Sequence, residues 1–215
     1  MQPTYIVGGW QRCGTSMMME SLIAGGMEAI FSRERTKAMN ANAGSETYVP
    51  NREYFEPGIE HLRSAKWPHM CAGRLFKMLQ NGPLNLSLSG FHMNIVYMCR
   101  DPHEAFESYR AAFGKNPPGT RNPQHLWQRH QENLQKMMLR HDMTVVPVWY
   151  NNTRDYPGQV FEDLWNRGWP IDPQRAAETV KPELKRFHFN NAKVFGTEYE
   201  VTEWDDPRET LDLVA

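Results

Sequence analysis

A glycine-framed loop near the N-terminus is the feature that most constrains the fold of this chain. The apolar run TYIVGG at residues 4–9 predicts a buried strand, and it leads into a loop, residues 9–14, in which two glycines enclose four other residues. Residues 15–23 then have the composition of a helix, which a pair of glycines ends. A strand, a glycine loop and a helix in this order direct backbone N–H groups and the positive end of the helix at one point, which suits an anion.

The loop departs from the Walker A pattern of nucleoside-triphosphate-binding proteins at its lysine. That lysine follows the second glycine, whereas here Thr15 follows Gly14, with Ser16 next in the chain. The nearest cation is Arg12, inside the loop. Its guanidinium and the two hydroxyl groups add donors to the backbone N–H groups, so the loop is a candidate anion site. Taken by itself, the pattern also fits a glycine turn with a Ser or Thr N-cap and no ligand.

A second candidate site follows the apolar run NIVYMC at residues 94–99. Arg100 comes directly after this run, and Ser108 lies about two helical turns further along the chain. An arginine at the end of a strand and a hydroxyl on the following helix can hold one further phosphate group. The alternative is that Arg100 pairs with Asp101 or with the C-terminus of a helix.

No metal site is predicted. Nucleoside triphosphatases hold magnesium with an aspartate at the end of an apolar strand, but here the only such aspartate, Asp101, follows an arginine. The missing lysine, and an aspartate whose neighbour is an arginine, disfavour a function driven by ATP or GTP. The three cysteines, Cys13, Cys71 and Cys99, have no CxxC spacing, which indicates reduced thiols of a cytosolic protein rather than a zinc site.

Short apolar runs alternate with helical segments along the rest of the chain. Further strands are predicted at residues 73–79, 94–99 and 143–150, and further helices at residues 58–65, 102–114, 124–141, 157–168 and 172–180. The alternation predicts an α/β fold with a mainly parallel central sheet, and the glycine loop after its first strand makes a P-loop NTPase-like three-layer fold the expected type. Pro147 predicts an edge position or a strand end for the run that contains it. Parallel sheets bind ligands at the carboxyl ends of their strands, so the loops after residues 9 and 99 should form the site.

Length and composition fit a single globular domain. The chain has 215 residues, 40% of them hydrophobic, and we take residues 1–215 as one domain with a candidate C-terminal extension from about residue 193. A net charge of −1 gives no support for binding to nucleic acid or to an anionic membrane. The sequence contains no apolar run long enough to span a membrane and no signal-peptide pattern, so a cytoplasmic protein is expected.

The two motifs together resemble those of the PAPS-dependent sulfotransferases, in particular the compact, bacterial sulfotransferase-like type with a P-loop. The stretch YIVGGWQRCGTSMMMESL is similar to the family's 5′-phosphosulfate loop, and NIVYMCRDPHEAFESY to its 3′-phosphate motif. Matching positions are Arg12, Gly14, Thr15 and Ser16 in the first, and Arg100, Asp101, Pro102 and Ser108 in the second. The first motif departs from the family at Gln11, which replaces a proline, and at Cys13, which replaces a serine.

The resemblance implies a transferase that takes a sulfuryl group from 3′-phosphoadenosine 5′-phosphosulfate (PAPS) without a metal. The loop N–H groups, including that of Cys13, with Thr15 and Ser16 would hold the 5′-phosphate. Arg12 would stabilise charge on the bridging oxygen as the sulfuryl group leaves. Arg100 and Ser108 would hold the 3′-phosphate and so select this donor over ADP-like nucleotides.

The acceptor side of the reaction is less constrained. We expect a hydroxyl or amine acceptor, on a small molecule, glycan or peptide, and a general base to take its proton. Glu56 is the favoured base, because the matching stretch of similar proteins lies near the acceptor pocket. Other candidate bases are Glu34, Glu53, His61 and His92, while Lys77 is a candidate second cation near the sulfuryl group and Lys185 and Arg186 are candidate nucleotide contacts. The sequence does not indicate an oligomeric state.

Two other classes of function stay open at this point. One is a P-loop kinase for small molecules or nucleotides, which would bind ATP with magnesium. The other is a nucleotide-binding or assembly module without catalysis, which the substitution at Cys13 would permit.

Overall fold

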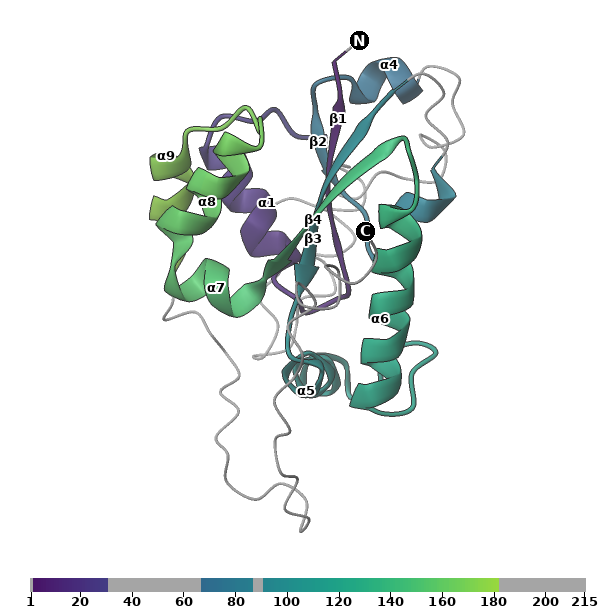
Figure 1. The fold of residues 1–215 in the computed structure, drawn as a ribbon. Helices are drawn as coiled ribbons and strands as arrows, with labels where there is room; N and C mark the ends of the chain where they lie inside the picture. The colour runs from purple at the N-terminus through teal and green to yellow at the C-terminus, as the bar shows by residue number, and fades with distance from the viewer. Residues whose placement is uncertain (1, 31–66, 87–90, 182–215) are drawn as a thin grey trace, which may run out of the picture.

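Four parallel strands form the central sheet of the structure. The computed structural model describes residues 2–30, 67–86 and 91–181. Its strands in these ranges are β1 (Thr4–Gly9), β2 (Leu75–Lys77), β3 (Met93–Cys99) and β4 (Met143–Trp149). Their order across the sheet is β2-β1-β3-β4, and every pair is parallel (Figure 1). The predicted α/β fold with a parallel central sheet is therefore confirmed.

Helices cover both faces of the sheet and one of its ends. In the described ranges they are α1 (Thr15–Ala24), α4 (Trp67–Cys71), α5 (Pro102–Phe113), α6 (Pro123–Met138), α7 (Tyr150–Asp155), α8 (Pro157–Asn166) and α9 (Pro173–Glu178), with a 3₁₀ turn, η1, at Pro83–Asn85. Figure 1 shows α1, α8 and α9 on one side of the strands and α6 on the other. Helix α5 lies below the carboxyl ends of the strands in that view.

The central strands are buried on both faces, which explains their uninterrupted apolar sequences. Val7 of β1 and Val96 of β3 belong to the hydrophobic core that also contains Phe161 of α8. The neighbouring side chains Ile6 and Ile95 belong to a second core on the α6 side. Because successive side chains of a strand point to opposite faces, each of these strands contributes to both cores.

Pairing of β1 with β3 brings the two sequence motifs to the same edge of the sheet. The register runs from Thr4 opposite Met93 to Gly9 opposite Met98. The glycine loop after β1 and the arginine after β3 therefore begin at adjacent strand ends, as the sequence predicted.

Several boundaries differ from the sequence prediction. β2 has three residues instead of the predicted seven. Helix α6 ends at Met138, and beyond it Arg140 donates to Asp142 Oδ1 at 2.8 Å and to Leu84 O at 3.1 Å, which ties the chain to η1. Tyr150 begins α7 instead of ending β4, and Thr153 Oγ1 donates to Trp149 O at 3.1 Å to close this first turn.

The edge position predicted from Pro147 is confirmed within the described sheet. β4 pairs there with β3 only, and Pro147 lies opposite Tyr97. A proline has no N–H to donate to a further strand, so this position tolerates it. The predicted helix at residues 58–65 and the extension from about residue 193 lie outside the described residues.

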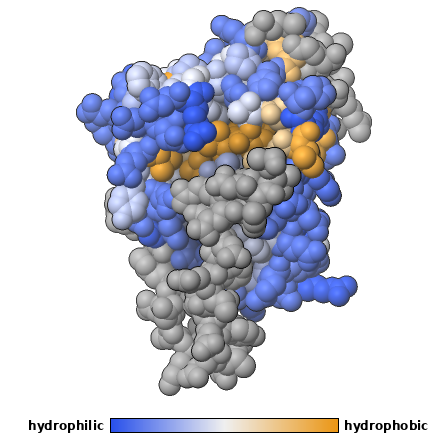
Figure 2. All heavy atoms as spheres, in the orientation of Figure 1, coloured by the Kyte–Doolittle hydropathy of each residue, from blue (hydrophilic) through white to orange (hydrophobic). Residues whose placement is uncertain are grey.

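Surface polarity follows this arrangement. Figure 2 shows hydrophilic residues over the outer helices and a band of hydrophobic residues between them, where β4 faces the viewer. Among the described helices none is both long and apolar enough to span a lipid bilayer.

Candidate functional site

The loop between β1 and α1 has an unusual backbone conformation. Gly9, Arg12 and Gly14 have φ angles of 130°, 71° and 87°. A Cβ atom on Gly14 would lie 2.6 Å from Cδ2 of Tyr150, and one on Gly9 would lie 2.7 Å from the carbonyl oxygen of Met98. Both glycines are therefore required by the φ angle and by the close approach of β3 and α7 to the loop.

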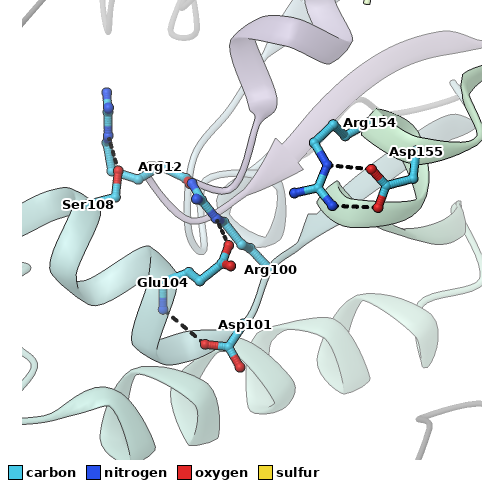
Figure 3. Close-up of polar contacts among 7 residues, drawn as sticks. All are labelled: Arg12, Arg100, Asp101, Glu104, Ser108, Arg154 and Asp155. Carbon is cyan, nitrogen blue, oxygen red and sulfur yellow. Dashed lines mark hydrogen bonds and ion pairs between the residues drawn. The ribbon is translucent and has the colours of Figure 1, made fainter. Parts of the chain in front are cut away.

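Arg12 is the loop residue that carries the network of the site. Its left-handed φ is uncommon for a residue with a side chain. The carbonyl oxygen of Arg12 accepts a hydrogen bond from Arg100 Nη1 at 2.8 Å, and Arg12 Nε donates to Ser108 Oγ at 3.1 Å (Figure 3). The structure therefore joins three residues that the sequence analysis assigned to two separate phosphate groups.

Arg100 is held by several groups of the protein. Its Nε donates to Glu104 Oε2 at 3.0 Å, and both side chains of this ion pair are about nine-tenths buried. Its guanidinium also lies 4.4 Å from the ring centroid of Tyr150, a cation–π distance. The alternative of a pair with Asp101 is wrong, because Asp101 accepts a hydrogen bond from the Glu104 backbone N–H at 2.9 Å and caps α5.

Each strand of the described sheet contributes a cation at or just after its carboxyl end. They are Lys77 in β2, Arg12 after β1, Arg100 after β3 and Arg154 in α7, after β4. Neighbouring strands lie about 4.8 Å apart, so three spacings separate the outer strands by roughly 14 Å. A row of cations of this length matches an extended ligand with anionic groups at more than one point.

Lys77 is buried, with 5% of the residue exposed, so the alternative of a surface lysine is wrong. It is the last residue of β2, and its register partner is Val7, two residues before the start of the loop. Its predicted place near a sulfuryl group stays a prediction.

Helix α1 begins without a side-chain cap. Its N-cap residue is Gly14, and no side chain accepts a hydrogen bond there, so the alternative of a Ser or Thr N-cap is wrong. Thr15, which is buried, and Ser16, which is half-buried, are the first two residues of the helix. Their hydroxyl groups therefore lie where the helix N-terminus would meet an anion.

Cys13 is a neutral, buried thiol. Burial raises its pKa to about 12, against the smaller opposing attraction of Arg100 and a backbone hydrogen bond from Trp10. Only the thiolate is a good nucleophile, so Cys13 does not suit nucleophilic catalysis near neutral pH.

Three residues at or near the loop and Arg100 were not predicted from the sequence. Tyr150 lies against Gly14 and the guanidinium of Arg100, Glu104 pairs with Arg100, and Arg154 follows Tyr150 by one helical turn (Figure 3). Tyr150 and Arg154 follow the carboxyl end of β4, the position at which parallel sheets place ligand-binding residues. That rule, applied to the third strand end as well as to the first two, could have found them.

Of the candidate general bases, His92 is the one that lies within the described residues. Glu56, Glu34, Glu53, His61, Lys185 and Arg186 lie outside the described residues. His92 lies just before β3, at the amino end of the sheet, where its Nε2 and Thr144 Oγ1 are 2.7 Å apart. A strand of seven residues is about 20 Å long, so His92 is too far from the loop to act there.

A hollow of about 520 Å³ lies between α8 and α9, away from this network. Its lining includes Glu162 and Glu178 and neither lysine nor arginine. It is therefore a poor site for an anion. In the part of the chain that the structure describes, no three His, Cys, Asp or Glu side chains gather as a metal site would need.

Comparisons with known proteins give only distant likenesses. No protein-family model matches the chain, and no curated protein is significantly similar to it in sequence. Retinol dehydratase, in complex with androsterone and the inactive cofactor PAP, is 16% identical with a TM-score of 0.41, over 84% of this chain and 64% of its own. This chain thus spans slightly less than two thirds of that enzyme.

Two further solved structures show the same level of likeness. The sulfotransferase domain of an olefin synthase from Synechococcus is 14% identical with a TM-score of 0.44, over 85% of this chain and 82% of its own. An unliganded sugar kinase from Janibacter is 14% identical with a TM-score of 0.41, over 81% of this chain and 98% of its own. Because the TM-scores lie below 0.5, these likenesses carry no argument about activity.

Proposed function

We propose that this protein transfers a sulfuryl group from PAPS to a hydroxyl or amine acceptor. The observation that carries the proposal is the network of Arg12, Arg100 and Ser108, which links the phosphate loop to the end of β3. PAPS has anionic groups at its 5′ and 3′ positions, and the row of strand-end cations offers partners for both. The sequence motifs assign the same residues to these two groups.

The glycine loop and the start of α1 hold the 5′-phosphosulfate in this scheme. The loop N–H groups and the hydroxyls of Thr15 and Ser16 donate to its oxygens, and the N-terminal end of α1 adds positive potential. Lys77 approaches from the end of β2. The guanidinium of Arg12 stabilises charge on the bridging oxygen, a type of contribution worth about 10²–10³ in rate.

Arg100 and Ser108 hold the 3′-phosphate. Nε and Nη1 of Arg100 bind Glu104 and the Arg12 carbonyl, whereas Nη2 has no hydrogen-bond partner among the described residues and can donate to a phosphate oxygen. Ser108 accepts from Arg12 and keeps its own O–H to donate. Its side chain is fully buried, so we expect Arg12 to turn from Ser108 toward the bridging oxygen when the donor binds.

The reaction is an in-line displacement in this scheme. The acceptor oxygen or nitrogen forms a bond to sulfur while the bond from sulfur to the 5′-phosphate oxygen breaks. The proton of the acceptor passes to a general base, for which Glu56 is our candidate. Adenosine 3′,5′-bisphosphate (PAP) leaves with the electrons of the broken bond.

A non-catalytic binding module is the second candidate, and Cys13 is the observation that favours it. The buried thiol is a weak hydrogen-bond donor at a loop position where the resembling family has a serine hydroxyl. A P-loop kinase is disfavoured by the missing lysine.

Transfer of radiolabelled sulfate from PAPS to a mixture of phenols, sugars and peptides tests the proposal. We expect transfer by the original protein, no dependence on magnesium, and a loss of about 10²–10³ in rate for Arg12→Ala. Tight binding of PAP with no transfer to any acceptor would support the binding module. Magnesium-dependent transfer of phosphate from ATP would contradict the proposal.

A further inference from the structure

A third arginine lies beside the Arg12–Arg100 network and is used by none of the steps above. Arg154 belongs to α7, which begins directly after β4, and β4 is the neighbour of β3. Arg154 therefore follows the strand end next to that of Arg100 in the sheet.

Asp155 fixes the orientation of this arginine. Nε and Nη2 of Arg154 donate to the two carboxylate oxygens of Asp155 in a bidentate pair. The third nitrogen, Nη1, has no hydrogen-bond partner among the described residues. Figure 3 shows this nitrogen turned away from Asp155, toward the side on which Arg100 lies.

Burial and charge distinguish Arg154 from an ordinary surface arginine. Its side chain is 18% exposed, whereas Arg167, which makes a comparable pair with Asp163 on α8, is 55% exposed. The pKa of Arg154 is raised, first by the hydrogen bonds that it donates to Asp155 and, to a smaller extent, by the charge of Glu104. Glu104 is the carboxylate that pairs with Arg100, so its charge acts on both arginines.

We propose that Arg154 binds the 3′-phosphate of the donor together with Arg100, and so makes the site selective for 3′-phosphorylated nucleotides. The inference rests on the proposed function, which assigns the 3′-phosphate to Arg100. Arg154 lies one helical turn after Tyr150, whose ring contacts the guanidinium of Arg100, so the two side chains share a face of α7 that is turned toward Arg100. A phosphate monoester is close to dianionic at neutral pH, and two arginines match its charge.

The test compares the affinities of PAP and ADP, which differ in the 3′-phosphate and share the adenosine, by calorimetry without magnesium. We expect Arg154→Met to lower the affinity for PAP about tenfold, the effect of losing one charge-assisted hydrogen bond. The affinity for ADP should change by less than about twofold. Arg154→Lys, which keeps the charge, should weaken PAP by about threefold at most. The matched control is Arg167→Met, which should change neither affinity.

The outcomes separate this inference from the proposed function. If the original protein shows no preference for PAP over ADP, both fail. If it prefers PAP, but Arg154→Met lowers the affinities for both nucleotides equally or lowers neither, only the proposed role of Arg154 is wrong. A selective loss in Arg154→Met that Arg154→Lys largely restores supports it.

Discussion

Arg12 shows at the scale of one residue how the candidate site is held. A side chain in the left-handed region is uncommon, and such strain persists only where the surroundings impose it. Here Arg100 holds the carbonyl oxygen and Ser108 accepts from the side chain. The loop conformation therefore depends on residues about 90 positions away in the chain, at the end of β3 and on α5.

Gly14 offers the sharpest test of this loop geometry. We expect Gly14→Ala to lower the free energy of unfolding by roughly 1–3 kcal/mol, because a φ of 87° strains any other residue and the new Cβ would clash with Tyr150. Urea unfolding measures the effect, and PAP binding should weaken with it.

Gly158→Ala is the matched control for that substitution. Gly158 is the second residue of α8, and nothing lies within 4 Å of a Cβ added there. We expect this variant to be unchanged or more stable by about 0.5 kcal/mol, with PAP binding intact. Equal effects of the two substitutions would show that the loop does not need a glycine at position 14.

At the scale of elements, the sequence predicted best what is buried locally. β1, β3 and β4 are apolar runs, and α5 begins with a proline after a capping aspartate, so their positions were evident. Helix α7 was missed because the sequence YNNTRD contains poor helix formers and the turn is closed by Thr153.

The contacts of the site were harder to predict than its elements. The strand ends indicated that Arg12, Arg100 and Ser108 would lie near one another. Two contacts depend on how α5 packs against the loop. Arg12 donates a hydrogen bond to Ser108, 96 positions further along the chain, and Arg100 pairs with Glu104 instead of Asp101. Local spacing carries no information on that packing.

Helix α5 contributes the carboxylates of two ion pairs, one buried and one exposed. Glu104→Gln should destabilise the protein by roughly 3 kcal/mol, because it leaves the guanidinium of Arg100 buried without a counter-charge. Glu107→Gln removes the exposed pair with Arg110 on the same helix and should cost less than about 0.5 kcal/mol. Urea unfolding of both variants makes the comparison, and similar losses in the two would contradict a structural role for the Arg100–Glu104 pair.

At the scale of the whole molecule, two hydrophobic cores pack on opposite faces of the sheet whose carboxyl strand ends form the candidate site. The core on the α6 side includes polar side chains, among them His130, which is 3% exposed. Its Nε2 lies 3.2 Å from Cys99 Sγ, and its ring stacks on Trp127 at 5.4 Å. The stability of the fold should therefore depend on the protonation of this histidine.

The burial of His130 predicts that the free energy of unfolding falls as the pH becomes acidic. Burial lowers its pKa from 6.5 to about 3, so between these values the unfolded chain binds a proton that the folded chain does not. Stability from this group is complete above pH 6.5 and is lost as the pH falls toward 3, at up to about 1.4 kcal/mol per pH unit. In His130→Phe the decline measured by urea unfolding from pH 7 to pH 4 should be shallower.

The comparison of slopes separates this effect from simple loss of packing. A packing defect in His130→Phe would shift the whole curve by a constant amount and leave its slope unchanged. Parallel curves for the two proteins would therefore show that His130 takes up its proton equally well in the folded state.

The central claim is that the strand-end cations select a nucleotide with a 3′-phosphate. The most direct measurement is a calorimetric titration of the original protein with PAP, ADP and magnesium-ATP under one set of conditions. We expect PAP to bind at least about tenfold more tightly than ADP, since it alone places a phosphate between Arg100 and Ser108. Binding of magnesium-ATP more tightly than PAP would contradict the account.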